Sequence, residues 1–190
     1  MMGWKNVKDH YRITHIVQVS KTDNGRDGGG VDAICIGSSY IRDLIAIGMD
    51  GSILKRYESG NEHLERYMRE MDADLDVLKR LVLSPDTFAG DGITVYTWEG
   101  AEILEKQCEV FGWPNVTHDG CLMYENTFSL NKSEVIFRAK REAKLRMKSA
   151  QEVLDSYQKK TQEMQEYLDA CRLQLDALYA DYPEKELGGI

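Results

Sequence analysis

The chain has 190 residues, a charged fraction of 29% and a net charge of −8 at neutral pH. This composition is typical of a folded protein with room for one globular domain plus an extension, and it excludes a wholly disordered chain. The acidic balance argues against a general affinity for nucleic acid, because phosphate binding requires a basic surface. No run of 18 apolar residues occurs, so no membrane-spanning segment is expected.

The N-terminal residues lack the apolar core and the small-residue cleavage site of a secretory signal. The four cysteines are scattered through the chain without CxxC spacing: Cys35, Cys108, Cys121 and Cys171. Reduced thiols in a cytosol are the simplest interpretation of this pattern. We therefore expect a cytoplasmic location.

The first third of the chain predicts antiparallel strands. Residues 1–12 are polar and fit either a short helix or an arm. Alternating or β-branched apolar residues predict strands over 13–20, 31–37, 44–48 and 52–57. A Gly-rich stretch over 23–30 predicts a loop between the first two strands, and Asp50-Gly51 predicts a tight hairpin turn between the last two.

Helices and strands are both predicted in the next part of the chain. Apolar residues at helical spacing predict one helix over 61–83, which ends at Ser84-Pro85. A strand is predicted over 93–98, a short helix over 100–112, and a strand or an extended segment over 123–128. Asn131 or Ser133 is expected to cap a long final helix, with Glu134 as a favourable first-turn charge.

These elements predict the α+β class. A small antiparallel sheet domain with one or two covering helices is followed by a long C-terminal coiled-coil helix. The expected divisions are a globular domain over 1–130, a helical arm over 131–182 and a flexible tail over 183–190.

The strongest pattern is an unbroken 3-4 spacing of apolar positions from Ala143 to Tyr182, with no Pro or Gly. A 3.5-residue repeat over five heptads keeps one apolar seam on one side of a helix. Such a seam needs cover, and self-association, with a dimer favoured, is the preferred interpretation over packing on the parent domain or on a host protein. The residues assigned to self-association are Met147, Ala150, Leu154, Tyr157, Met164, Leu168, Cys171, Leu175 and Leu178.

Basic side chains gather near the start of the same helix, and the rest of the helix is acidic. The basic candidates for contact with a partner or with nucleic acid are Arg138, Lys140, Arg141, Lys144, Arg146 and Lys148. A helix dipole favours the opposite order of charge, which indicates that this basic stretch has another use. A solvated flank of the coil is the preferred interpretation, and ligand contact is the alternative.

No metal or cofactor site is expected. Asp72, Asp74 and Asp76 resemble the opening of a calcium loop, but Val77 and Leu83 stand where that loop needs a glycine and a carboxylate. The Gly-rich stretch lacks the Lys-Ser/Thr of a phosphate-binding loop. The four histidines show no zinc-ligand spacing: His10, His15, His63 and His118.

No catalytic constellation is evident either, and we expect a protein that is not an enzyme. No nucleophile elbow or kinase signature occurs in the chain. Cys121 lies near His118 in sequence, and a Cys-His pair is conceivable. Structural or surface thiols are far commoner than catalytic ones.

The segment over 111–128 mixes aromatic, turn-forming and polar residues in a short space. The preferred interpretation is structural: three aromatic residues plug the junction between the sheet and the long helix, namely Trp113, Tyr124 and Phe128. The alternative is a polar recognition surface made by Asn115, Thr117, Asp119, Glu125 and Asn126.

Within this segment, Trp113-Pro114-Asn115-Val116-Thr117, Asp119-Gly120 and Met123-Tyr124-Glu125-Asn126-Thr127-Phe128 are followed by a charged helix. This arrangement resembles a segment of uncharacterised accessory proteins of tailed phages and prophages, over residues 111–146. The resemblance implies a small phage protein that acts in the bacterial cytoplasm by binding a host factor. Inhibition of a host defence system, in the manner of an anti-CRISPR protein, is the most specific version.

Two other functions remain open at this point. One is a nucleic-acid-binding protein that uses the basic stretch over 138–148. The other is a structural or assembly component of the phage particle, with the long helix as its means of oligomerisation.

Overall fold

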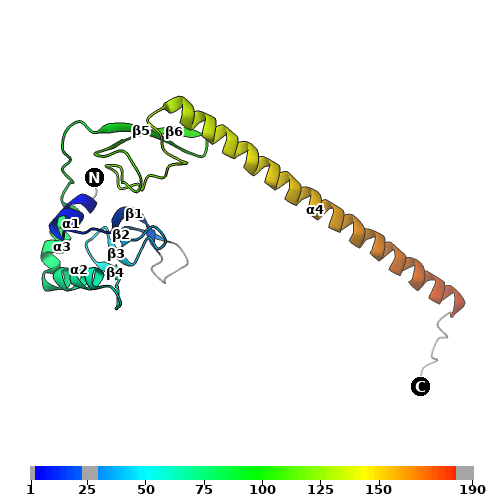
Figure 1. The fold of residues 1–190 in the computed structure, drawn as a ribbon. Coiled ribbons are helices and arrows are strands. Elements are labelled where there is room, and N and C mark those ends of the chain that lie inside the picture. Colours follow the sequence, from blue (N-terminus) through cyan, green and yellow to red (C-terminus); the bar gives the residue numbers. More distant parts are fainter. Residues whose placement is uncertain (1–2, 23–29, 183–190) are drawn as a thin grey trace, which may run out of the picture. The chain divides into compact units, whose positions relative to one another are not determined.

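The computed structural model describes residues 3–22 and 30–182 (Figure 1). The chain divides into two compact units, Met1–Ala139 and Lys140–Ile190. The Gly-rich loop predicted over 23–30 lies outside the described residues except for Gly30, and the predicted tail over 183–190 lies outside them entirely. The predicted α+β class is confirmed, with antiparallel strands followed by a long C-terminal helix.

Four antiparallel strands form the larger sheet of the first unit, in the order β1-β2-β3-β4. They are β1 (Ile16–Thr22), β2 (Val31–Gly37), β3 (Ile45–Gly48) and β4 (Ile53–Lys55). The turn between β3 and β4 is the one that Asp50-Gly51 predicts. Gly51 has φ 85°, and the Gly48 N–H donates to the Ser52 carbonyl oxygen at 2.7 Å.

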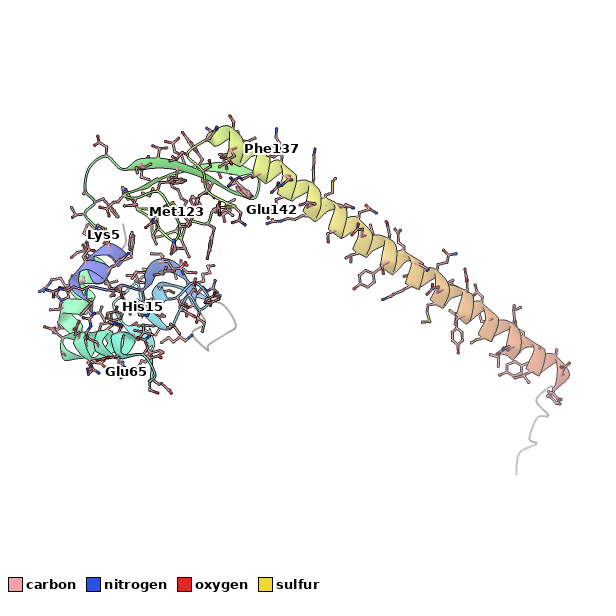
Figure 2. All side chains as sticks on the ribbon, viewed as in Figure 1. Lys5, His15, Glu65, Met123, Phe137 and Glu142 are labelled. Carbon is pink, nitrogen blue, oxygen red and sulfur yellow. The ribbon has the colours of Figure 1, made fainter. Side chains whose placement is uncertain are left out.

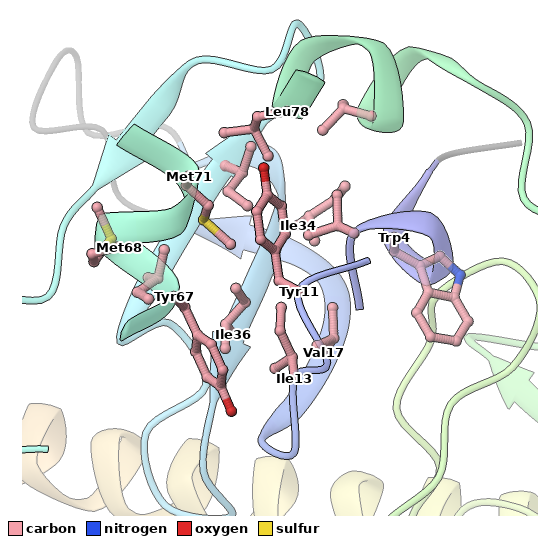
Figure 3. Packing of buried hydrophobic residues seen from close by; sticks show 14 of the residues in the cluster. Trp4, Tyr11, Ile13, Val17, Ile34, Ile36, Tyr67, Met68, Met71 and Leu78 are labelled. Atoms are coloured by element: carbon pink, nitrogen blue, oxygen red, sulfur yellow. The ribbon is translucent and has the colours of Figure 1, made fainter. Parts of the chain in front are cut away.

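One face of this sheet carries the main hydrophobic core (Figure 3). Strand alternation places Ile34 and Ile36 of β2 on this face, where both are fully buried. Three helices contribute to the same core: α1 (Trp4–His10), α2 (Glu62–Ala73) and α3 (Leu75–Leu83). Tyr67 of α2 and Leu78 of α3 are fully buried in it. Residues 1–12 therefore contain a short helix rather than an arm.

Asp74 divides the helical region, and the expectation of one continuous helix over 61–83 is wrong. Its backbone is non-helical, with φ −152° and ψ 86°, and its carboxylate accepts a hydrogen bond from the Val77 N–H at 2.9 Å. This is an N-cap, because the side chain satisfies an N–H that has no partner inside α3. The break allows α2 and α3 to bury separate apolar faces, with Met71 and Leu78, in the same core.

A two-stranded sheet follows, and it replaces the short helix predicted over 100–112. β5 (Ile93–Glu99) pairs with β6 (Glu102–Cys108) along its whole length. The connecting turn has two residues, with Gly100 at φ 57° in the first central position. A two-residue hairpin turn requires a positive φ there, which glycine adopts without strain. The hairpin therefore outweighs the helical spacing of the apolar residues in this stretch.

The segment between β6 and the final helix has no named strand. Single β-bridges join it to the hairpin, with Cys108 opposite Thr117 and Tyr96 opposite Ser129, and a third lies within the segment, with Val116 opposite Leu122. The strand or extended segment predicted over 123–128 instead contains a turn, in which the Phe128 N–H donates to the Tyr124 carbonyl oxygen at 2.9 Å.

The aromatic plug predicted for this segment is right for one residue only. Phe128 is buried in a small second core with Val95 and Met123. Trp113 and Tyr124, in contrast, are 39% and 55% exposed. Their assignment to the plug is wrong, because Phe128 and the flexible side chain of Met123 already fill the space beside the hairpin.

The final helix, α4 (Lys132–Asp181), runs for 50 residues. Of the two predicted caps the structure uses Asn131, whose Oδ1 accepts from the Ser133 N–H at 2.9 Å. Glu134 accepts a hydrogen bond from the Ser129 hydroxyl at 2.6 Å, which lowers the pKa of this carboxyl group. The first two turns of α4 belong to the first unit, where Val135 is fully buried. In the second unit, the described residues are the remainder of the helix.

Candidate functional site

The second unit contains a helix whose apolar side chains have no cover among the described residues of that unit. We use the term seam for the nine residues assigned to self-association: Met147, Ala150, Leu154, Tyr157, Met164, Leu168, Cys171, Leu175 and Leu178. Those with large side chains are between 43% and 70% exposed. Figure 2 shows the side chains along α4 beyond Glu142.

The seam is a long apolar feature on an otherwise charged helix. A soluble helix normally turns such a stripe toward a core, and an exposed stripe marks an interaction site. Helical rotation places positions three and four apart on one side, so the nine residues form a single strip. Among the described residues of the second unit nothing covers this strip, and a second polypeptide would supply the missing cover.

The basic residues predicted for ligand contact have different surroundings. Arg138 is fastened to the first unit: its guanidinium donates to the carbonyl oxygens of Glu125 and Phe128 and pairs with Glu134. It is therefore a structural residue rather than part of a free basic surface. Arg146 pairs with Glu142 one turn earlier on the helix.

The rest of the basic stretch is more open. Lys148 lies 3.7 Å from Glu152, an exposed ion pair of small energetic value. Lys140, Arg141 and Lys144 have no acidic partner within 4.0 Å among the residues that the structure describes. Three neighbouring positive charges on one helix are therefore available to a partner.

A second exposed surface lies on the first unit, in a hydrogen-bonded turn after β2. Tyr40 is 94% exposed and Ile41 is 51% exposed. Both of their N–H groups donate to the Ser38 hydroxyl oxygen, at 3.2 and 3.1 Å, and the Ser38 N–H donates to the Ile41 carbonyl oxygen at 2.8 Å. A Cβ on Gly37 would lie 2.2 Å from that same carbonyl oxygen, so the turn packs tightly. We call residues 38–43 the Tyr40 turn.

Asp43 fixes the far end of the Tyr40 turn. Its carboxylate accepts from the Thr22 hydroxyl at 2.7 Å and from the Lys55 ammonium at 3.2 Å. Burial raises the pKa of Asp43, but these two hydrogen bonds outweigh it and hold the pKa below its usual range. The carboxylate is therefore charged at neutral pH, and the turn is held at both ends.

An open cleft of about 420 Å³ lies beside the Tyr40 turn. Its other walls come from Gln18, Leu122 and Tyr124. Small-molecule pockets are mostly apolar and enclosed, whereas tyrosines around an open polar cleft are typical of protein interaction surfaces. The hydrogen-bonded turn is already ordered, which lowers the entropic cost of binding.

This surface was not predicted from the sequence. The signal was Tyr40-Ile41, two adjacent large apolar residues directly after Ser38-Ser39, in a connection between two strands. A serine that accepts hydrogen bonds from the N–H groups two and three residues later stabilises such turns. That pattern predicts an ordered turn that displays the following side chains.

The conceivable catalytic pair, Cys121 and His118, is not arranged for nucleophilic chemistry. The His118 ring stacks on Phe88, with ring centroids 3.8 Å apart and an interplanar angle of 13°. The Cys121 thiol donates to the Leu122 carbonyl oxygen at 3.8 Å, and burial raises its pKa. A catalytic cysteine needs the opposite shift, because the thiolate is the nucleophile.

Of the five polar residues predicted as an alternative recognition surface, one is buried and Asp119 is exposed. Thr117 is fully buried, and its hydroxyl donates a hydrogen bond to the Asp119 carboxylate and accepts one from the Cys121 N–H at 3.1 Å. Asn115 is half-buried, whereas Glu125 and Asn126 are exposed. Thr117 is therefore a structural residue of the turn over 117–121.

The aspartates of the calcium-like pattern also separate. Asp72 pairs with Arg56 at 2.5 Å, and Asp74 caps α3. Between residues 3 and 182, leaving aside 23–29, no group of three or more His, Cys, Asp or Glu side chains is arranged to hold a metal ion.

Comparison with known proteins adds nothing to these observations: the chain matches no family model, no curated protein and no solved structure. None of the described helices combines the length and the apolar character that crossing a lipid bilayer requires. The seam and the Tyr40 turn are therefore the two features from which a function is inferred.

Proposed function

We propose that this chain is a non-catalytic binding protein, which self-associates through the seam of α4 and engages a partner protein with the Tyr40 turn. The observation that carries this proposal is the seam itself, an apolar strip of heptad spacing whose large side chains are exposed along its length. Burial of a Leu or Met side chain contributes about 1.5–3 kcal/mol. A seam of this size therefore favours association over exposure to water.

The Tyr40 turn supports the second part of the proposal. Tyrosine is enriched among the residues that dominate binding energy at protein interfaces. Tyr40 is almost fully exposed on a turn that hydrogen bonds keep ordered. The adjacent cleft, with the exposed Tyr124 on its wall, provides room for a partner side chain.

The partner we favour is a bacterial host protein, and a defence complex is the most specific version of the proposal. Support comes from the resemblance of residues 111–146 to accessory proteins of tailed phages. The net charge of −8 also suits a basic host surface that otherwise binds nucleic acid. The bacterial cytoplasm would then be the place of action.

Self-association is tested by one substitution inside the seam and the same substitution outside it. Leu168→Asp places a charge in the seam, whereas Leu173→Asp places it on the opposite face of α4, where Leu173 is 72% exposed. By light scattering, the unmodified chain and the Leu173→Asp variant are expected to be oligomeric, and the Leu168→Asp variant monomeric. A monomeric unmodified chain, or equal behaviour of the two variants, would overturn the proposal.

Partner binding is tested by affinity purification from phage-infected cells. Tyr40→Ala is expected to lose a protein that the unmodified chain retains. Phe137→Ala is the matched control, because Phe137 is another aromatic residue that is 66% exposed. Equal recovery of the same protein with both variants would show that the Tyr40 turn is not the binding surface.

Nucleic-acid binding is a second candidate, supported by the three open charges of Lys140, Arg141 and Lys144. It predicts an affinity that falls steeply with salt, because bound phosphates release counterions. A mobility-shift titration at low salt decides this point, and absence of retardation excludes the candidate.

A further inference from the structure

We infer that two copies of α4 pair in the antiparallel direction, in a register that places Leu154 opposite Cys171 of the second copy. This inference rests on the proposed self-association and goes beyond it, because it fixes the direction and the register of the pair. Three features of the helix carry it: the sizes of the seam residues, the distribution of charge and the residues beside the seam.

Residue sizes along the seam are complementary only in the antiparallel direction. Heptad a positions of one helix then face d positions of the other, whereas in a parallel pair each position faces its own copy. The layers of the inferred register are Ala143–Tyr182, Met147–Leu178, Ala150–Leu175, Leu154–Cys171, Tyr157–Leu168 and Thr161–Met164, each formed twice. Every small residue meets a large one.

The parallel pair lacks this complementarity. Ala143 and Ala150 would each face their own copies and leave gaps, and Tyr157 would face a second Tyr157. Gaps and overpacked layers both lower the stability of a well-packed interface. A shift of the antiparallel register by one heptad in either direction leaves seam residues at the ends uncovered.

Charge favours the same direction. From residue 140 to 148 the helix carries five basic side chains and only Glu142 as an acidic one. From residue 162 to 181 it carries five acidic side chains and only Arg172 as a basic one. An antiparallel pair brings each basic end beside the acidic end of the second copy, whereas a parallel pair brings the two basic ends within about one Debye length, near 10 Å, of each other.

Residues beside the seam agree with this register. Arg146 faces Asp181 of the second copy across one edge of the pair, and Lys144 faces Tyr179 across the other. Lys160 faces Tyr167 on the same edge as Arg146 and Asp181, close to the centre of the pair. Arg146 and Asp181 form an ion pair, and each of the two lysines can place its ammonium group over the ring of the facing tyrosine. Lys144, one of the three open charges of the basic stretch, thus gains an aromatic neighbour.

Disulfide formation in the full chain tests the inference, in a glutathione buffer with peptide mapping by mass spectrometry. In the inferred register the two native Cys171 residues lie about 25 Å apart along the pair, at 1.5 Å per residue. The unmodified chain should therefore form no Cys171–Cys171 bond. Leu154→Cys should form covalent dimers through a bond between the introduced cysteine and Cys171 of the second copy.

Met147→Cys is the matched control, at the same heptad position one repeat earlier. In the inferred register the cysteine introduced by this substitution lies about 10 Å along the pair from Cys171 of the second copy, so no bond should form. A parallel pair would instead join each cysteine to its own copy in all three chains.

The outcomes separate this inference from the proposal on which it rests. A peptide that links positions 154 and 171, in a chain that light scattering shows to be dimeric, supports the antiparallel register. A Cys171–Cys171 bond, or no bond between positions 154 and 171 in such a dimer, overturns the register and leaves self-association intact. A monomeric chain overturns both.

Discussion

The guanidinium of Arg138 donates a hydrogen bond to the carbonyl oxygen of Phe128 at 3.3 Å. It also binds the Glu125 carbonyl oxygen and the Glu134 carboxylate. Phe128 is buried in the second core, so Arg138 connects the first turns of α4 to the packing of the 111–128 segment. A residue that looks like part of a basic surface in the sequence is a structural residue in the fold.

Arg138→Gln is therefore expected to destabilise the first unit. Two carbonyl oxygens lose a charged donor, and hydrogen bonds to charged groups are worth about 1.5–3 kcal/mol each. Because Arg138 is partly exposed, we expect about 1–2 kcal/mol in total, measured by urea denaturation. Arg141→Gln, three residues later and exposed, should change the stability by less than about 0.5 kcal/mol. Equal effects of the two substitutions would contradict this role.

Gly120→Ala should be more destabilising than Gly100→Ala. Both glycines have a positive φ, of 84° and 57°, so alanine is strained at each by about 1–2 kcal/mol. A Cβ on Gly120 would also lie 2.3 Å from a side-chain carbon of Val19, whereas a Cβ on Gly100 meets no atom within 4 Å. The difference between the two variants in thermal unfolding measures this contact, and identical losses would show that β1 can move away.

The Val19 contact also illustrates what the sequence does not reveal. The Val19 N–H donates to the Gly120 carbonyl oxygen at 2.8 Å, and the Trp4 indole N–H donates to the His118 carbonyl oxygen at 3.1 Å. Both bonds join residues that are far apart in the sequence. Periodicity and turn chemistry report only neighbours in sequence, so the way the 111–128 segment docks on β1 could not be predicted.

Local signals predicted the elements where one pattern was strong. β2 has the predicted bounds, and the long helix has an uninterrupted apolar repeat. Local sequence signals gave the wrong element where two local preferences compete. Asp74 sits in a helical apolar pattern but caps a new helix, and Gly100 opens a hairpin in a stretch whose apolar spacing also fits a helix. The choice depends on which faces reach a core, which is a tertiary property.

In the candidate site, too, one part could be predicted from a local sequence pattern and the other could not. The seam depends on a repeat that any helix must place on one face, and so its residues could be chosen from the sequence. The Tyr40 turn depends on three hydrogen bonds and on the close approach of Gly37, which no period in the sequence reports. Whether the seam residues pair with a second copy stays a prediction.

Asp119 should make a small contribution to stability that is lost in acid. Burial raises the pKa of this carboxyl group, but hydrogen bonds from Lys106 and Thr117 outweigh it and lower the pKa below its usual value. A lowered folded-state pKa stabilises the protein above the unfolded pKa of about 3.9, and this contribution disappears as the pH falls through the folded pKa. Stability should therefore decline below about pH 4.

Asp119→Asn tests this expectation. At pH 7 the variant should be less stable by up to about 1 kcal/mol, since the carboxylate is half exposed, and the difference should shrink toward pH 3. Asp91→Asn is the control, at an exposed carboxylate without an ion pair to any described residue. A difference between Asp119→Asn and the unmodified chain that does not vary between pH 7 and pH 3 would contradict the assignment. Urea denaturation at each pH provides the measurement.

Cys35, which lies on strand β2, should resist alkylation in the folded protein. The thiol is fully buried beside Ala33 and Ala46. Burial raises its pKa to about 11, and the negative charge of Asp43 acts in the same direction. Since the thiolate is the reactive form, this raised pKa slows the alkylation of Cys35 at pH 8 even before access is considered.

Iodoacetamide labelling at pH 8, followed by peptide mapping, measures this difference. Cys35 should remain unlabelled in the folded chain and react only after the chain is unfolded in urea. Asp43→Asn is expected to speed the labelling of Cys35 in the folded protein, because it removes a negative charge that raises the pKa of the thiol. If Cys35 reacts as fast in the folded chain as in the chain unfolded in urea, the thiol is not protected by burial in the sheet.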